Sequence, residues 1–155
     1  LIKLGLLPFG EIRPLDASCP TLTFNSLGRH ISCLARTRVT NNRSPWLALT
    51  ESGDDHVVAM SHGEGRFYAS PQWLKTLHAA GQVATQYVDL AGQPTHELPH
   101  NPNGSLDAIE GITSPDGRVL GKMGHSERIG ENVFTNVPGA KDQHIFEAGV
   151  AYFAK

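Results

Sequence analysis

The sequence predicts an α/β fold, because segments with the two-residue period of a strand alternate with segments that carry helix-capping signals. Residues 30–39 alternate cleanly between an apolar face and a polar face. Residues 56–60 form a short apolar run rich in valine, which is typical of a buried strand. Ser70 caps a helix with Pro71 in its first turn, and Gly81 ends it. The 155 residues suit one domain with a sizeable core.

The first third of the chain contributes two further helical signals. Residues 1–6 have the pattern of the end of a helix, with Gly5 near its C-terminus and Pro8 just beyond. We therefore expect the rest of that helix to lie upstream. Residues 10–28 are punctuated by Pro, Gly and Asp and are expected to form a loop, and Ser44-Pro45 starts a short helix.

The second half of the chain predicts three strands and a final helix. Residues 82–88 form one strand, and residues 109–113 and 118–123 form a pair around a Ser-Pro-Asp-Gly turn. A polar loop over residues 90–104 separates them. Residues 142–153 are helical, and one side of this helix is expected to carry Ile145, Phe146, Gly149, Val150 and Phe153.

Composition excludes several classes of protein. Hydrophobic residues make up 39% and charged residues 18%, with a net charge of -2, which is typical of a globular domain and not of a strongly basic nucleic-acid binder. No apolar run approaches the roughly 20 residues that a membrane span needs. The two cysteines do not make a disulfide framework, so we expect a cytoplasmic protein and neither a nucleic-acid nor a membrane partner.

The segment after the last predicted strand carries a candidate catalytic pair. Residues two apart in extended backbone point the same way, so His125 and Glu127 are expected to lie side by side. A carboxylate that fixes an imidazole tautomer is the base-and-orienter half of a nucleophilic triad. On spacing alone, a surface hydrogen bond is the more common explanation of such a pair.

Two other segments combine glycine with polar side chains. Residues 61–66, Ser-His-Gly-Glu-Gly-Arg, follow a buried strand, and strand ends in α/β sheets are common ligand sites. Residues 101–105, Asn-Pro-Asn-Gly-Ser, have the composition of a turn. Taken alone, both segments are also explained as tight loops.

No metal site is expected, and neither cysteine looks activated. His96 and His100 are four apart, but Pro99 between them prevents a helix from presenting both to one ion. Cys19 lies in a loop and Cys33 on the apolar face of a predicted strand, so neither has the surroundings of a reactive thiolate.

Together, these motifs resemble the glutaminase domain of the phosphoribosylformylglycinamidine synthase family, a class I (triad-type) glutamine amidotransferase. The resemblance covers almost the whole chain, and four segments carry it in the family's order. The first is Phe24-Asn25-Ser26-Leu27-Gly28-Arg29-His30, and the second is Ser61 to Phe67, which resembles the His-Gly-Glu-Gly-Arg signature. The third is Asn101 to Ser105 with Ile109-Glu110-Gly111-Ile112, which resembles the Pro-Asn-Gly-Ser and Ala-Gly-Ile stretch. The fourth is Leu120 to Arg128, which resembles the Met-Pro-His-Pro-Glu-Arg signature.

The resemblance implies a flavodoxin-like, mostly parallel sheet flanked by helices. It implies that His125 and Glu127 are the triad His and Glu, and that the backbone near Ser61, His62, Gly63 and Glu64 helps to hold glutamine. The family's triad Cys attacks the glutamine side-chain amide and releases ammonia to a synthetase domain. The ATP and Mg²⁺ that the reaction uses belong to that synthetase domain, so no cofactor is expected in this chain.

The chain departs from the family pattern in two ways. The Gly-x-Cys-Asn-Gly segment that carries the nucleophile is absent, and residues 1–8 look like the helix that follows it. We therefore expect residues 1–155 to be the C-terminal portion of one amidotransferase domain, incomplete on its N-terminal side and inactive alone. Gly124 and Ser126 also replace two prolines of the signature, which should loosen the loop around the candidate histidine.

Two alternatives remain open at the level of sequence. One is a non-catalytic docking or regulatory module built on the amidotransferase fold. The other is a glutaminase of a different pathway, such as a guanylate-type amidotransferase, against which the His-Gly-Glu-Gly-Arg pattern argues.

Overall fold

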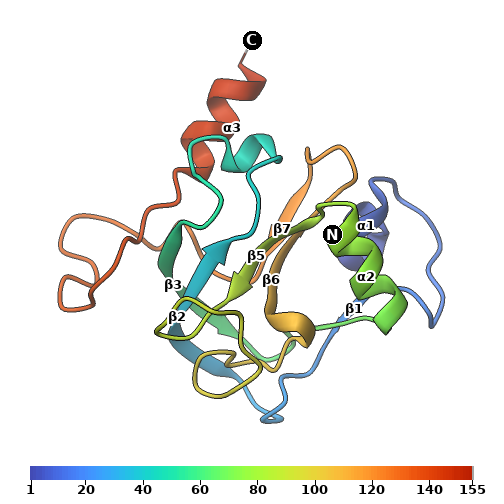
Figure 1. Cartoon of the computed structure of the whole chain (residues 1–155), viewed down its shortest axis with the longest axis horizontal. Helices are drawn as coiled ribbons and strands as arrows, with labels where there is room; N and C mark the ends of the chain where they lie inside the picture. The colour runs from blue at the N-terminus through green and yellow to red at the C-terminus, as the bar shows by residue number, and fades with distance from the viewer. Residues whose placement is uncertain (155) are drawn as a thin grey trace.

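The computed structural model describes residues 1–154 and has an antiparallel five-stranded sheet at its centre (Figure 1). The sheet order is β3-β2-β5-β6-β7. Its strands are β2 (Ile31–Val39), β3 (Asp55–His62), β5 (Val83–Tyr87), β6 (Ile109–Thr113) and β7 (Leu120–Lys122). A separate two-stranded sheet pairs β1 (Thr21–Thr23) with β4 (Arg66–Tyr68).

Short helices connect and cover these strands. The α-helices are α1 (Leu6–Phe9), α2 (Pro71–Ala79) and α3 (Ile145–Phe153). Single 3-10 turns occur at η1 (Ile2–Leu4), η2 (Pro45–Leu47) and η3 (Leu106–Ala108). No helix in the described residues is long and apolar enough to cross a membrane.

The expectation of a mostly parallel sheet is wrong for this part of the chain, because every strand pairing in the described residues is antiparallel. A parallel pair needs a crossover of a dozen or more residues, usually a helix, whereas antiparallel neighbours need only a short connection. Helix α2 supplies the one long helical crossover between strands of the sheet. It links β3 to β5, and these two strands run in the same direction with β2 between them.

Helices flank the sheet on both faces, as expected. On β5, Val83 packs into the apolar cluster that contains Leu77 of α2, while the next residue, Ala84, packs with Ile145 of α3. Successive strand residues point to opposite faces, so α2 and α3 cover opposite sides of β5. Beyond the sheet, α3 projects as the end of the described chain (Figure 1).

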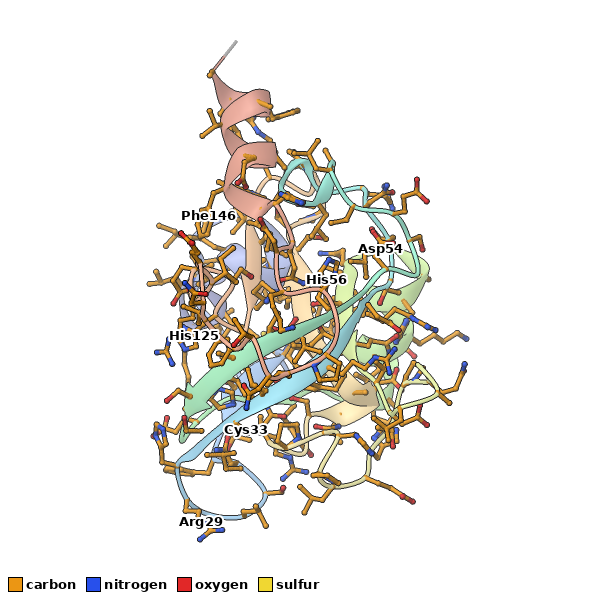
Figure 2. All side chains as sticks on the ribbon, turned by 90° about the vertical axis from the view of Figure 1, so that its left-hand side faces the viewer. Arg29, Cys33, Asp54, His56, His125 and Phe146 are labelled. Carbon is orange, nitrogen blue, oxygen red and sulfur yellow. The ribbon has the colours of Figure 1, made fainter. Side chains whose placement is uncertain are left out.

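Most predicted elements form within a few residues of their expected bounds. Ser70 caps α2, and its hydroxyl accepts the Trp73 N–H at 3.3 Å. The strands β1 and β4 were not expected, because each has only three residues. The expected apolar side of α3 is partly wrong: Phe146 and Val150 are 55% and 67% exposed, and Phe146 points outward at the base of the helix (Figure 2).

The sheet curls so that its two outer strands approach each other. The chain leaves β7 and returns to β3 on the edge away from β2, where the His125 N–H donates to the Ala59 carbonyl oxygen at 2.7 Å. This isolated bridge places His125 beside β3 (Figure 2). The curl therefore brings the last predicted motif next to the strand that ends in residues 61–62.

Candidate active site

His125 and Glu127 form the pair that the sequence predicted. The His125 Nδ1 atom lies 2.7 Å from Glu127 Oε1. A proton on Nδ1 serves this contact, which leaves the lone pair on Nε2 for use as a base. The two side chains are 31% and 55% exposed, so the pair lies open at the surface. Hydrogen bonds from its own backbone N–H and from His125 lower the pKa of Glu127 and keep this carboxylate ionised.

The loop after β3 is held by one buried side chain, Asn25, from the first motif of the resemblance. Its amide nitrogen donates to the His62 carbonyl oxygen at 2.7 Å, and its amide oxygen accepts the Gly65 N–H at 3.2 Å. Its backbone N–H also donates to the Gly63 carbonyl oxygen at 2.9 Å. Asn25 is 2% exposed, so these bonds are shielded from water and fix the path of residues 62–65.

The third motif packs beneath this loop and is not a surface turn. Asn103 is fully buried, and its amide nitrogen donates to the Gly65 carbonyl oxygen at 2.8 Å and to the Tyr87 hydroxyl at 3.1 Å. The same nitrogen lies 3.2 Å from His62 Nε2. A Cβ on Gly65 would collide with the His62 ring, so a glycine is needed for this close approach.

Residues from distant motifs meet at the end of β3. Burial is the largest cause that lowers the pKa of His62, and the nearby His125 and His30 lower it further. Ser61 also lies within this group, with its hydroxyl 3.0 Å from His30 Nε2. His62 is therefore favoured in its neutral form, and its Nδ1 atom has no hydrogen-bond partner in the described residues.

Glu64, the fourth residue expected to hold substrate, lies on a cavity of about 310 Å³. Met123, two residues before the candidate base, lines the same cavity, as do Glu110 and Lys122. The structure thus brings Ser61, His62 and Glu64 into the neighbourhood of the segment that carries His125.

Sequence reasoning missed Glu110, whose side chain is fully buried on β6. Its Oε1 atom lies 3.2 Å from Lys122 Nζ and accepts the Gly124 N–H at 2.5 Å. The signal was present, because Glu110 is the one charged residue in the otherwise apolar and neutral strand Ile109–Thr113.

The family model described as a CobB/CobQ-like glutamine amidotransferase domain matches residues 1–153. The chain belongs to this family. The four motifs and the His125–Glu127 contact lie within the matched residues.

Curated relatives of this amidotransferase domain carry the name phosphoribosylformylglycinamidine synthase subunit PurQ. The protein from Chlorobaculum tepidum is 34% identical over 154 residues, which are 99% of this chain and 59% of the relative. The protein from Thermus thermophilus is 38% identical over 121 residues, 77% of this chain and 52% of the relative. The chain therefore spans about half the length of the curated relatives it matches.

A solved structure described as PurLQS from Thermotoga maritima has the same fold. The two superpose with a TM-score of 0.63 at 26% sequence identity, over 85% of this chain and 52% of that chain. The antiparallel sheet described above is thus compatible with an amidotransferase fold.

The two cysteines of the amidotransferase domain lie in unreactive surroundings. Cys33 is on β2, where it packs against the cluster that contains Met60 and Tyr87, and burial raises the pKa of its thiol (Figure 2). Cys19 lies in a loop with its Sγ atom 3.6 Å from the Asp16 carboxylate. The buried position of Cys33 does not stabilise a thiolate.

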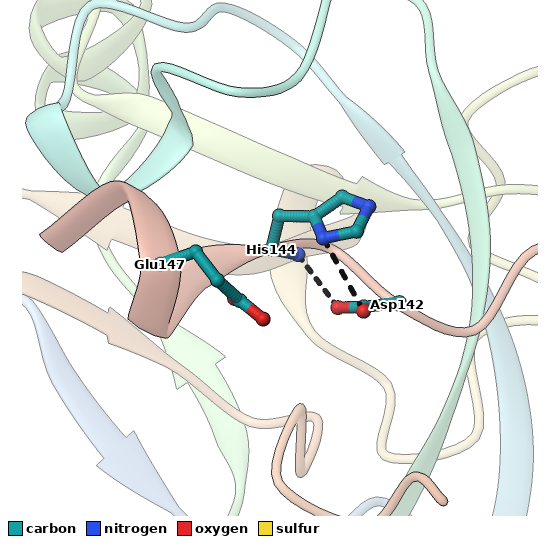
Figure 3. Close-up of side chains that lie close together, drawn as sticks. All are labelled: Asp142, His144 and Glu147. Carbon is teal, nitrogen blue, oxygen red and sulfur yellow. Dashed lines mark hydrogen bonds and ion pairs between the residues drawn. The ribbon is translucent and has the colours of Figure 1, made fainter. Parts of the chain in front are cut away.

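One group of side chains has the spacing of metal ligands but is explained more simply as a helix start. The ligand atoms of Asp142, His144 and Glu147 lie within 4.8 Å of one another (Figure 3). Asp142 Oδ1 accepts the His144 N–H at 2.8 Å, and Asp142 Oδ2 lies 3.3 Å from His144 Nδ1. These contacts order the turn before α3, and all three side chains are solvent-accessible.

Proposed function

We propose that this chain is part of the glutaminase of a phosphoribosylformylglycinamidine synthase. In this proposal the glutaminase hydrolyses glutamine and supplies ammonia for the ATP-dependent amidination of formylglycinamide ribonucleotide in cytoplasmic purine biosynthesis. The observation that carries the proposal is the 2.7 Å contact between His125 Nδ1 and Glu127 Oε1 in a chain of the amidotransferase family. The names of the curated relatives supply the pathway.

In this reaction His125 acts as the general base and acid, and Glu127 holds its tautomer. His125 Nε2 accepts the thiol proton of a cysteine nucleophile, whose sulfur then forms a thioester with the glutamine side-chain carbonyl carbon. The proton passes to the leaving nitrogen, and ammonia departs. A water molecule that transfers a proton to the same Nε2 attacks the thioester carbonyl carbon. The C–S bond then breaks, the cysteine sulfur takes that proton back, and glutamate is released.

Glutamine would be held by the backbone around Ser61, His62, Gly63 and Glu64. The hydrogen bonds of Asn25 and Asn103 fix this loop beside His125, which supports the assignment. Preorganised backbone groups bind a polar substrate without the cost of ordering a mobile loop.

The nucleophile is not one of the two cysteines in the chain, because neither Cys19 nor Cys33 has an environment that favours a thiolate. We therefore expect the isolated 155-residue chain to show no glutaminase activity. ATP and Mg²⁺ would be bound by the synthetase partner that uses the ammonia.

The test is glutamine hydrolysis by the full-length protein together with its synthetase partner. His125→Ala should lower kcat by several orders of magnitude, up to about 10⁶-fold, because loss of one triad member disables the whole group. His96→Ala, which removes an exposed histidine from the loop before the third motif, is the matched control and should leave the rate unchanged. An unchanged rate in His125→Ala would refute the proposal in favour of a non-catalytic docking module, and turnover by the isolated chain would refute its predicted inactivity.

A further inference from the structure

The backbone that leads into His125 is held by a buried ion pair, Glu110–Lys122. Glu110 Oε1 accepts the Gly124 N–H at 2.5 Å. It also shares the Met123 N–H, at 3.1 Å, with the backbone carbonyl oxygen of Glu110. Lys122 Nζ donates to the Gly124 carbonyl oxygen at 3.0 Å. Both polar backbone groups of Gly124 are therefore bound by the two members of one ion pair, and the next residue is the candidate base.

The pair is largely buried, although both residues also line the cavity described above. The Glu110 side chain is fully buried and that of Lys122 is 10% exposed. The second carboxylate oxygen of Glu110 accepts a hydrogen bond from the Thr85 hydroxyl. Hydrogen bonds in such a water-poor site are stronger than at the surface, and they hold the bound backbone in one position.

Glycine at position 124 is what allows this approach. A Cβ there would lie 3.0 Å from Glu110 Oε1 and 2.5 Å from Val58 Cγ2. The family signature that residues 120–128 resemble has a proline at this position, and a proline has no N–H. The glycine supplies the N–H that the Glu110 carboxylate binds.

The loop is thus anchored where its two signature prolines are absent. Ser126, which replaces the second proline, donates its hydroxyl proton to the buried Gln143 side chain at 2.7 Å. Hydrogen bonds therefore restrain the backbone on both sides of His125.

We propose that Glu110 is a positioning residue: with Lys122 it fixes the 123–124 backbone, and so sets the His125 imidazole against Glu127. The inference rests on the proposed role of His125 as the base. It predicts that the length of the Glu110 side chain affects the position of the His125 imidazole more than its negative charge does.

Two conservative variants separate reach from charge. Glu110→Gln keeps a side-chain oxygen at the same reach, and the Thr85 hydroxyl can turn to accept from the new amide. Glu110→Asp keeps the charge that Lys122 needs but withdraws the carboxylate by one methylene. In the full-length protein with its partner, Glu110→Gln should lower stability, because Lys122 loses its charged partner, but it should retain kcat within a few-fold. Glu110→Asp should lower kcat by up to about 10²-fold with KM nearly unchanged, because a misplacement of about 1 Å is enough for such a loss.

The same variants are examined by imidazole ¹⁵N NMR, with the His125 signal assigned from His125→Ala. The wild type and Glu110→Gln should show one fixed Nδ1–H tautomer at His125, whereas Glu110→Asp should show a mixture. Thr85→Val is the matched control, because it removes a hydrogen bond to Glu110 without touching residues 123 and 124. It should lower stability and leave the His125 tautomer intact.

The inference is overturned if Glu110→Asp keeps the fixed tautomer and kcat, if Glu110→Gln loses them as fully as Glu110→Asp, or if Thr85→Val disturbs His125 as much as either. A failure of the proposed function is distinguishable from these results. In that case His125→Ala keeps full activity, and the NMR comparison still decides whether Glu110 positions the imidazole.

Discussion

Lys122→Met isolates the Glu110 carboxylate in the core. The variant replaces the ammonium 3.2 Å from Glu110 Oε1 with an apolar side chain of similar length. Removing one partner of a buried ion pair costs about 3–5 kcal/mol, because the other charge stays buried and uncompensated. Lys122 retains some contact with water, so we expect a loss at the lower end, about 3 kcal/mol in the free energy of unfolding at neutral pH.

The loss should depend on pH in a defined direction. In the wild type, burial is the largest influence and raises the pKa of Glu110, but Lys122, Thr85 and the Gly124 N–H together outweigh it and the pKa is lowered. This lowered pKa gives stability that is present above the unfolded-state value and lost as the pH falls through the folded value. Without Lys122 the pKa of Glu110 should rise above its ordinary value. The stability that the variant loses at neutral pH is then regained as the pH falls and the carboxyl group becomes neutral. The difference in the free energy of unfolding between the variant and the wild type therefore narrows.

Urea unfolding followed by tryptophan fluorescence, at about pH 7.5 and about pH 5, measures both effects. Lys75→Met is the matched control, because Lys75 is exposed on α2 and its loss should change stability by no more than about 0.5 kcal/mol. The reasoning fails if Lys122→Met costs less than about 1 kcal/mol at neutral pH, or if the gap stays constant between the two pH values.

Three further substitutions test the core and the site. Leu77→Ala removes a fully buried α2 side chain and should lower the free energy of unfolding, measured by calorimetry, by about 2–5 kcal/mol. The control Leu90→Ala, at a residue that is 79% exposed, should lower it by no more than about 0.5 kcal/mol, and equal losses would contradict the described core. Asn103→Ala leaves the Gly65 carbonyl oxygen and the Tyr87 hydroxyl without their buried donor and should cost about 1–3 kcal/mol in urea unfolding, and a neutral result would show that Asn103 does not hold this loop. Burial lowers the pKa of His56 in the folded protein, so the unfolded chain binds more protons. Stability should therefore fall as the pH drops below about 6.5 towards the folded-state pKa. His56→Leu should flatten this part of the curve of stability against pH, and an unaltered slope would refute the lowered pKa of His56.

Local order was predictable from the sequence, whereas strand direction was not. The alternation in residues 30–39 and the Ser70-Pro71 cap depend on neighbours in the chain, and both elements form as expected. The direction of strand pairing depends on which strands become neighbours. Here the β2–β3 and β6–β7 connections lack long helices, and β2 inserts between the two strands that α2 joins.

The same distinction holds at the site. The contact between His125 and Glu127 forms as predicted, but not in the extended backbone that the prediction assumed. Residues 126 and 127 lie in a turn that the Arg128 N–H closes on the His125 carbonyl oxygen at 3.2 Å. The hydrogen bonds of Asn25, Asn103 and Glu110 cross between segments, and no local pattern reports them. A lone carboxylate in an apolar strand is the one signal that pointed to Glu110.

The bridge between His125 and Ala59 links the order of folding to the assembly of the candidate site. It joins positions far apart in the sequence, and closing such a long loop carries an entropic cost that is recovered only after both strands have formed. A nascent or partly unfolded chain therefore has its imidazole detached from the loop at the end of β3. The candidate site therefore assembles only as the sheet closes.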